Sequence, residues 1–256
     1  MGRVIAISNQ KGGCAKTTTT INLAAGLEEN GFKVLLVDYD PQGSLTKAYQ
    51  VKVNSMTPTS YHFTMEQLDA RIHVSELIDL IPTNNKLSAI QNELISFPDG
   101  TLYLSYAINE IREEYDFILI DCPPQTSLIA NNCYAAADEI IVPVFPGSYS
   151  VDGLVLLKGQ IDSVKKYFKN NLKVSGILIA NVDSNTKAAA RIKEIAAQCS
   201  EKFESHCFET TIPHSTVVND AQSSYKSLLQ FNKKAKVTIA YQKFVDEFLG
   251  GLKHEC

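Results

Sequence analysis

The stretch VIAISNQKGGCAKTT, Val4–Thr18, runs from an apolar segment through two glycines into Lys-Thr-Thr. Its apolar part predicts a buried strand, and Thr17–Asn30 has the apolar spacing of a helix. A glycine turn between a strand and a helix is the setting of a phosphate-binding loop. We expect Gly12 and Gly13 to turn backbone N–H groups inward, and the helix that starts near Lys16 to add the positive end of its dipole. The stretch therefore predicts an anion cradle.

The side chains after the glycines are suited to a nucleotide with Mg²⁺. Lys16 would place its charge on the β- and γ-phosphates, the Thr17 hydroxyl would ligate Mg²⁺, and Thr18 would hydrogen-bond the α-phosphate. A generic loop reads GxxxxGK[ST], whereas this one has Ala15 at the second glycine and an additional lysine, Lys11, at its start. We expect the backbone of Ala15 to lie at negative φ. The predicted nucleotide-binding loop comprises Lys11, Gly12, Gly13, Cys14, Ala15, Lys16, Thr17 and Thr18.

Two later strands end in acidic residues. Asp38 and Asp40 lie at the end of one apolar run, and Asp121 ends another. Open α/β sheets bind ligands at the carboxyl ends of their strands. We expect Asp40 to orient the attacking water or hold a Mg²⁺-bound water, and Asp121 to hold Mg²⁺ through water. Asp38, nearer the sheet, would be structural, and a turn-forming Asp-Pro pair would explain Asp40 without any chemistry.

Strand and helix patterns alternate along most of the chain. This alternation predicts a doubly wound α/β fold with a mainly parallel sheet and helices on both faces, in a single domain spanning 1–256. The expected strands are Val4–Ser8, Val34–Asp38, Phe117–Asp121, Glu139–Val144 and Val174–Ala180. The expected helices are Thr17–Asn30 with a left-handed cap at Gly31, Tyr103–Glu114, Leu128–Ala137, Val151–Phe168, Thr186–Phe203 and Lys236–Leu252. Val51–Pro82 is less regular, and we expect it to be a surface excursion between sheet strands.

The composition limits which partners and which cellular compartment we expect for the protein. A formal net charge of −4 gives no general attraction to DNA or to anionic membranes, so either partner would need a local basic patch. The six cysteines have no metal-type spacing and fit a reducing cytoplasm. No apolar run is long enough for a spanning helix, and no secretion signal is evident. We therefore expect a cytoplasmic protein.

The motifs ISNQKGGCAKTTTTINLA, KVLLVDYDPQGSLT and YDFILIDCPPQTS, in this order, resemble the ParA/MinD superfamily of deviant Walker A ATPases. The resemblance is closest to ParA and Soj-type partition ATPases and runs from Val4 to about Phe248. It implies ATP and Mg²⁺ as cofactors, with Asp40 required for hydrolysis and Asp121 as the Walker B acid. Lys11 would reach across an ATP-dependent homodimer to the partner's nucleotide. Asn181 and Pro213 would contact adenine.

The same resemblance implies DNA-binding and partner proteins. Members bind nonspecific DNA as ATP dimers and are stimulated by a ParB-like protein bound to a centromere-like site, so the expected localisation is nucleoid-associated. Many relatives carry arginines where this chain reads PHSTVV, Pro213–Val218. The candidate replacements are Lys187, Arg191, Lys193, Lys226, Lys233, Lys234 and Lys236. Lysines could serve because phosphate contacts need only positive charge, although a solvated helix face explains the same residues.

Other functions remain open at this level. A MinD-like membrane-cycling regulator would need a basic amphipathic terminal helix, whereas the tail FVDEFLGGLK, Phe244–Lys253, is acidic, so no stable membrane association is expected. An iron–sulfur protein of this fold would need cysteines at a dimer interface, where Cys133 is the one candidate. Asn181-Val182-Asp183 is similar to the base-reading segment of GTPases without its lysine. A small-molecule ligase or kinase could use the same loop.

Overall fold

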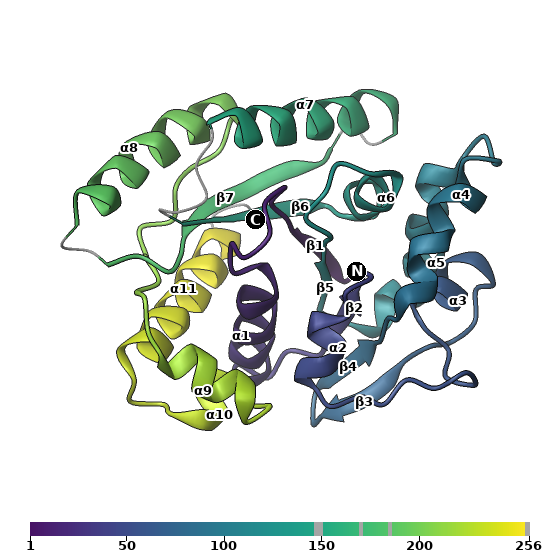
Figure 1. The fold of residues 1–256 in the computed structure, drawn as a ribbon, viewed down its shortest axis with the longest axis horizontal. Coiled ribbons are helices and arrows are strands. Elements are labelled where there is room, and N and C mark those ends of the chain that lie inside the picture. Colours follow the sequence, from purple (N-terminus) through teal and green to yellow (C-terminus); the bar gives the residue numbers. More distant parts are fainter. Residues whose placement is uncertain (146–150, 169–170, 184–185, 254–256) are drawn as a thin grey trace.

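The computed structural model describes residues 1–145, 151–168, 171–183 and 186–253. In these residues a seven-stranded sheet has the order β3-β4-β2-β5-β1-β6-β7 (Figure 1). The strands are β1 (Arg3–Ile7), β2 (Val34–Asp38), β3 (Ile72–Ser75), β4 (Ile78–Ile81), β5 (Phe117–Asp121), β6 (Glu139–Val144) and β7 (Lys173–Ile179). All neighbouring strands are parallel except β3, which pairs antiparallel with β4 at the edge of the sheet. The expected α/β fold is confirmed.

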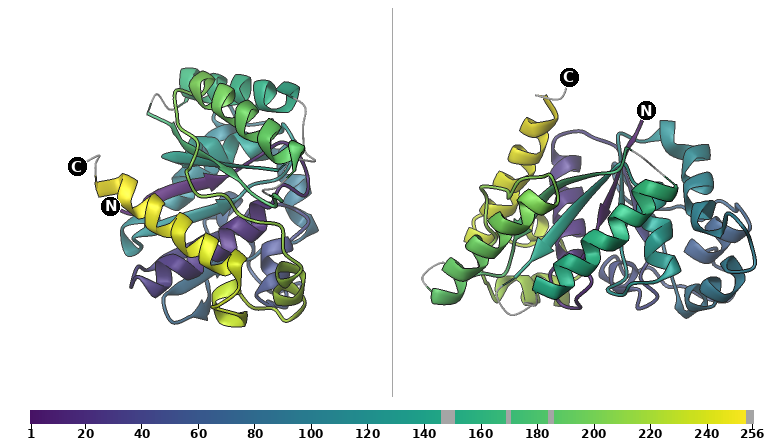
Figure 2. Two further views of the ribbon diagram at one scale, coloured as in Figure 1. Left: turned by 90° about the vertical axis from the view of Figure 1, so that its left-hand side faces the viewer. Right: turned by 90° about the horizontal axis from the view of Figure 1, so that it is seen from above.

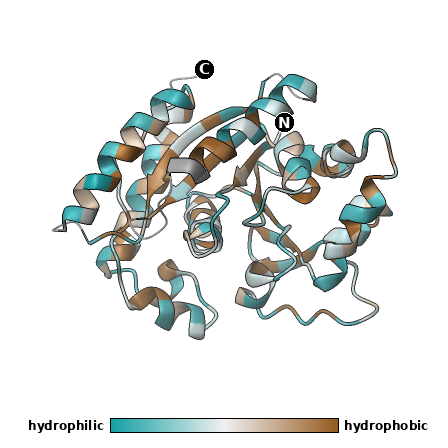
Figure 3. Ribbon diagram, turned by 45° about the horizontal axis from the view of Figure 1, so that its top comes forward, coloured by the Kyte–Doolittle hydropathy of each residue, from teal (hydrophilic) through white to brown (hydrophobic). Residues whose placement is uncertain are grey.

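Helices cover both faces of the sheet. They are α1 (Lys16–Glu29), α2 (Ser44–Ala48), α3 (Ser60–Met65), α4 (Ile90–Leu94), α5 (Tyr103–Ile111), α6 (Leu128–Ala136), α7 (Val151–Tyr167), α8 (Lys187–Lys202), α9 (Val217–Ser223), α10 (Leu228–Phe231) and α11 (Lys236–Lys253). Short 3₁₀ helices lie at Asn85–Ala89, Gly100–Leu102 and Arg112–Glu114. Figure 3 shows that the strands are mostly apolar, whereas the covering helices mix apolar and polar residues.

Two apolar layers hold the helices to the sheet. Because side chains alternate along a strand, Val4 and Ala6 of β1 face one layer while Ile5 and Ile7 face the other. The first layer contains buried residues of α3 to α8, and the second contains those of α1, α2 and α9 to α11. The expected closing helix is therefore confirmed as α11, which packs on the same face as α1.

The expectation for Val51–Pro82 is partly wrong. This segment does make an excursion through α3, but it ends in the hairpin β3–β4, and β4 pairs in parallel with β2 as part of the sheet. Ile78, Leu80 and Ile81 are buried there. Asp79 interrupts the apolar run and hides the strand from a sequence pattern. The structure tolerates this acid in β4 because Asp79 accepts a hydrogen bond of 2.6 Å from the Tyr115 hydroxyl.

The topology places the loops after β1, β2 and β5 beside one another. In the right-hand view of Figure 2 the N-terminus and the end of α11 lie at the upper edge, and the strand arrows point toward the opposite edge. The strand register pairs Ile7 with Asp121, and Asp38 with Asp121. The glycine loop and both acidic strand ends therefore meet at one edge of the sheet, as the sequence predicts.

Candidate nucleotide site

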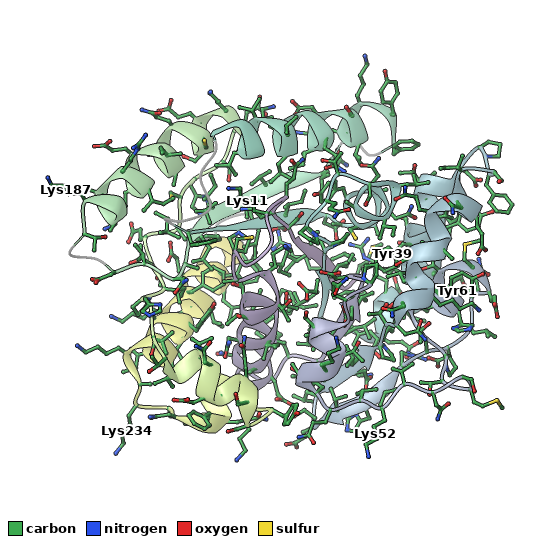
Figure 4. The ribbon with its side chains drawn as sticks, in the orientation of Figure 1. Lys11, Tyr39, Lys52, Tyr61, Lys187 and Lys234 are labelled. Carbon is green, nitrogen blue, oxygen red and sulfur yellow. The ribbon has the colours of Figure 1, made fainter. Side chains whose placement is uncertain are left out.

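A cavity of about 810 Å³ opens where these loops meet. Most of the predicted nucleotide contacts lie on its wall: Gly12, Gly13, Ala15, Lys16, Thr17, Thr18, Asp40, Asn181 and Pro213. These residues come from segments as far apart in the sequence as Gly12 and Pro213, and the fold brings them to one cavity. Lys11, Cys14 and Asp121 are not among the lining residues. Lys11 is exposed at the loop, near the centre of Figure 4, while Cys14 and Asp121 are buried behind the wall.

The glycine loop leaves room for an anion. Gly13 has φ 74°, a conformation that favours glycine, and a Cβ at Gly12 or Gly13 would meet no atom within 4 Å. The Lys16 side chain is buried, and its Nζ donates a 3.1 Å hydrogen bond to the carbonyl oxygen of Lys11. An ammonium held over an open backbone loop is suited to bind phosphate oxygens.

Ala15 does not have the negative φ that we expected. Its φ is 62° and its ψ 23°, in the left-handed region, at the N-cap of α1. The expectation was wrong because the chain must turn sharply into the helix at this residue, where the Ala15 carbonyl already accepts the first helical hydrogen bond from the Thr19 N–H, at 2.8 Å. A glycine would adopt the same conformation without contact between a Cβ and the carbonyl oxygen, which explains why generic loops have one there.

Thr17 and Asp121 form the part of the site that suits Mg²⁺. The Thr17 hydroxyl donates a 2.7 Å hydrogen bond to one Asp121 oxygen, Oδ2. The other oxygen, Oδ1, is buried and has no hydrogen-bond partner among the described residues. A buried carboxylate oxygen without a partner is costly unless a cation or a water fills the space beside it. The two side chains therefore fit a hydrated Mg²⁺ ion, with Thr17 as direct ligand and Asp121 bound through water.

Two buried acids at this edge have raised pKa values. Asp38 is fully buried, and its Oδ2 accepts hydrogen bonds from Thr46, at 2.7 Å from the backbone nitrogen and 2.6 Å from the hydroxyl. Burial raises the pKa of Asp38 to about 7 and that of Asp121 to about 8, and for Asp121 the charge of Asp38 is the second cause. Thr17 and Lys16 counteract part of the shift at Asp121. A divalent cation near Asp121 would favour its ionised form.

Asp40 lies on the cavity wall and is half-buried. One of its oxygens, Oδ1, accepts a 3.0 Å hydrogen bond from the Gln42 N–H. This contact is the turn role that an Asp-Pro pair would have without any chemistry. The structure therefore supports the turn role. The same side chain also borders the cavity, so Asp40 is in a position to contact a ligand.

The expected base contacts lie side by side at another part of the wall. Asn181 has φ 56°, and its side-chain oxygen lies 2.7 Å from Nδ1 of His214. The backbone of Pro213 bridges to Val182. Sequence reasoning missed the tail residues that also line the cavity: Val218, Asn219, Gln222, Tyr225 and Tyr241. The spacing of Val218 and Gln222 is that of one helix face, but nothing in the sequence indicates that this face meets the glycine loop.

The candidate DNA-binding residues form two separate groups. Lys187, Arg191 and Lys193 are exposed on α8, whereas Lys226, Lys233, Lys234 and Lys236 are exposed around α9 to α11. Figure 4 shows Lys187 and Lys234 directed outward at different corners of the molecule. Lys233 makes an ion pair of 2.7 Å with Glu29. The candidate DNA-binding residues therefore lie in two separate areas of the chain. None of them is among the residues that line the cavity.

The cysteines give no support to a metal cluster. Cys133 is 0% exposed, so it does not reach a surface where a second chain could meet it, and burial raises the pKa of its thiol. Over the residues that the structure describes, no group of three or more His, Cys, Asp or Glu side chains could hold a metal ion. Cys256 lies outside the described residues. Among the described helices, none has the length and apolar character required to cross a bilayer.

The chain is similar to several known proteins. A family described as "AAA domain" matches residues 2–174. The chromosome partitioning protein ParA of Myxococcus xanthus is 34% identical over 245 residues, covering 94% of this chain and 86% of the relative. The sporulation initiation inhibitor protein Soj of Bacillus subtilis is 30% identical over 251 residues, covering 96% and 98%.

Solved structures share the same fold. Cobyrinic acid a,c-diamide synthase from Mycobacterium smegmatis with bound ADP and magnesium has a TM-score of 0.85 and 28% identity, covering 100% of this chain and 97% of that chain. Apo McdA of Cyanothece has a TM-score of 0.87 and 24% identity, covering 98% and 100%. The first neighbour carries ADP and magnesium, the combination that Lys16, Thr17 and Asp121 fit here.

Proposed function

Because the chain belongs to the ParA/Soj family of P-loop ATPases, we propose that it is a Mg²⁺-dependent ATPase that dimerises on ATP and binds nonspecific DNA in that state. Hydrolysis would release the DNA and so segregate a plasmid or chromosome. The observation that carries this proposal is that the glycine loop, Lys16, Thr17 and Asp40 line one cavity, while Asp121 is hydrogen-bonded to Thr17 behind its wall. Relatives at 31–34% identity are named as chromosome partitioning proteins, which supports the choice of cargo.

The chain's own residues would act mainly by positioning and charge. Lys16 and the loop N–H groups would hold the β- and γ-phosphates, and the partner subunit's Lys11 would add a second positive charge as the phosphoryl group leaves. Asp40 would align the attacking water. Mg²⁺, when bound, neutralises charge on the phosphate oxygens. Thr17 would bind the ion directly, and Asp121 would hold it through water.

The remaining parts of the proposal concern partners. A ParB-like protein bound at a centromere-like site would stimulate turnover, and the ATP dimer would reside on the nucleoid within the cytoplasm. The exposed lysines around α9 to α11 and on α8 would contact DNA phosphates, which makes binding sensitive to salt and indifferent to sequence. A MinD-like positioning ATPase that answers to a membrane or another protein is the alternative.

The first test measures binding of the purified protein to nonspecific duplex DNA with ADP, with ATP, and with ATP in the Asp40→Ala variant. We expect binding that requires ATP, persists in Asp40→Ala and weakens as salt rises. Lys16→Ala is the control and should bind no DNA with either nucleotide. If wild type and Asp40→Ala hydrolyse or bind ATP yet ignore DNA, the partition function is wrong.

A second assay separates the alternatives that share this loop. ATP turnover is measured with DNA, with anionic vesicles and with small carboxylic acid substrates, since one structural neighbour is named as a diamide synthase. Stimulation by DNA supports the partition ATPase. Turnover that depends on vesicles supports the MinD-like alternative, and turnover that depends on a carboxylic acid and an amide donor supports a ligase.

A further inference from the structure

Thr18 is held by a part of the chain that lies 204 residues away. The side-chain nitrogen of Gln222, Nε2, donates a 3.1 Å hydrogen bond to the Thr18 hydroxyl oxygen. Gln222 belongs to α9, and Thr18 to the first turn of α1. Both residues line the nucleotide cavity, so the contact lies where a ligand would meet the protein.

This contact restricts the direction of the Thr18 hydroxyl hydrogen. A hydroxyl carries one hydrogen and can both donate and accept, whereas an amide nitrogen only donates. Because the Thr18 oxygen accepts from Gln222, its own hydrogen must point elsewhere. The cavity on whose wall Thr18 lies is where an anion would receive it. Gln222 thereby makes Thr18 a hydrogen-bond donor toward the cavity.

The backbone holds Gln222 in place. α9 ends at Ser223 and is followed at Tyr225 by a residue with φ 53°, whose N–H donates a 3.0 Å hydrogen bond to the Gln222 carbonyl. The Lys226 N–H donates to the Ala221 carbonyl, also at 3.0 Å, and Ala221 is buried. A left-handed tyrosine is strained, so it persists only where surrounding contacts fix it. The amide of Gln222 therefore extends from a closed helix end and not from a free loop.

A second connection joins the same tail to Thr18. The buried side chain of Asn22 donates a 2.8 Å hydrogen bond to the Thr18 carbonyl and accepts one of 2.9 Å from the Leu228 N–H. Thr18 is thus held at its carbonyl through Asn22 and at its hydroxyl by Gln222. The segment Gln222–Leu228 thus contacts Thr18 directly through Gln222 and indirectly through Asn22.

We propose that Gln222 is a positioning residue for nucleotide binding, which presents the Thr18 hydroxyl as a donor to the α-phosphate. The inference rests on the proposed function, nucleotide binding at this cavity, and on the sequence-based expectation that Thr18 contacts that phosphate. Gln222 itself acts through Thr18 and not on the phosphate. Its removal leaves the Thr18 hydroxyl free to rotate, and a carboxylate in its place accepts the Thr18 proton and turns it away from the nucleotide.

A double-mutant cycle on ADP affinity tests this inference. Isothermal titration with Mg²⁺ and ADP is applied to wild type, Thr18→Ala, Gln222→Ala and the double variant. We expect Thr18→Ala to weaken binding roughly tenfold or more, as for a hydrogen bond to a charged group, and Gln222→Ala to weaken it by about three- to tenfold. The double variant should be no weaker than Thr18→Ala, because Gln222 has no effect once the hydroxyl is gone.

Three further variants serve as controls. Thr18→Ser keeps the hydroxyl, so the effect of Gln222→Ala should return in that background. Gln222→Glu should bind ADP more weakly than Gln222→Ala. Ser223→Ala, on the same helix and exposed, should match wild type, and thermal unfolding without nucleotide should be alike for Gln222→Ala and Ser223→Ala.

The outcomes separate this inference from the proposed function. If Thr18→Ala leaves ADP affinity unchanged, the α-phosphate contact is wrong and the inference is wrong with it. If Thr18→Ala weakens binding but Gln222→Ala does not, only the inference is overturned. Additive losses in the double variant also overturn it, since Gln222 would then act on the nucleotide directly.

Discussion

Replacing Ala15 with glycine should stabilise the protein. Ala15 has φ 62°, a left-handed conformation in which a Cβ crowds the carbonyl oxygen. That conformation costs an ordinary residue about 1–2 kcal/mol, and glycine adopts it without strain. The greater freedom of glycine in the unfolded chain offsets roughly 0.5–1 kcal/mol of this gain. The expected net stabilisation is about 0.5–1 kcal/mol, or about 1–3 °C in Tm for a chain of this size.

The assay is thermal unfolding by circular dichroism without nucleotide. Ala190→Gly is the matched control, because Ala190 is exposed within α8 and has no left-handed strain to lose. It should lower stability by about 0.5–1 kcal/mol, so the two substitutions should shift Tm in opposite directions. A fall in Tm for Ala15→Gly as large as that for Ala190→Gly would refute the argument from backbone strain.

Three other perturbations follow from the described contacts. Without nucleotide, the free energy of unfolding should fall as the pH rises from about 5 to 7, by on the order of 1 kcal/mol per pH unit. The reason is that Asp38 and Asp121 have raised pKa values in the folded state and keep protons that the unfolded chain has released. Thermal melts of wild type and Asp121→Asn at several pH values check this, and an equal change of Tm with pH in both proteins would contradict it. Gly26→Ala should destabilise because its Cβ would lie 2.5 Å from Val245 Cγ2, and adding Val245→Ala should recover part of the loss, as urea unfolding can measure. Thr46→Val should cost about 2–4 kcal/mol, because Asp38 loses a hydroxyl donor and the Thr83 N–H an acceptor; a loss below 1 kcal/mol in the same urea assay would argue against a buried network.

The local parts of the fold could be predicted from the sequence. Strands such as Phe117–Asp121 are continuous apolar runs buried on both faces, and Gly31 does cap α1 with φ 82°. β4 could not be predicted in the same way. Its four residues include Asp79, whose charge is satisfied by the Tyr115 hydroxyl and by His73 from other elements. A pattern along the chain cannot show partners that only the folded sheet brings near.

The phosphate loop shows the same limit on a smaller scale. Glycines, lysine and threonines in a strand–turn–helix setting predict the anion cradle because each contact lies within a few residues of the next. The sign of φ at Ala15 depends on how the chain enters α1, which composition does not specify. The sequence therefore predicted the residues of the loop but not the strain stored in it.

The part of the cavity wall that the tail forms depends on pairings that no local pattern contains. Gln222 meets Thr18 across 204 positions, and Leu228 meets Asn22 across 206. Both contacts exist because α9, α10 and α11 pack on the same face of the sheet as α1. The tail that closes the core on this face thus also fixes the first turn of the nucleotide-binding helix. Under the role proposed for Gln222, a substitution in that tail would alter nucleotide affinity without touching the loop. A substitution that only loosens the core would instead lower Tm and leave the coupling between Gln222 and Thr18 unchanged.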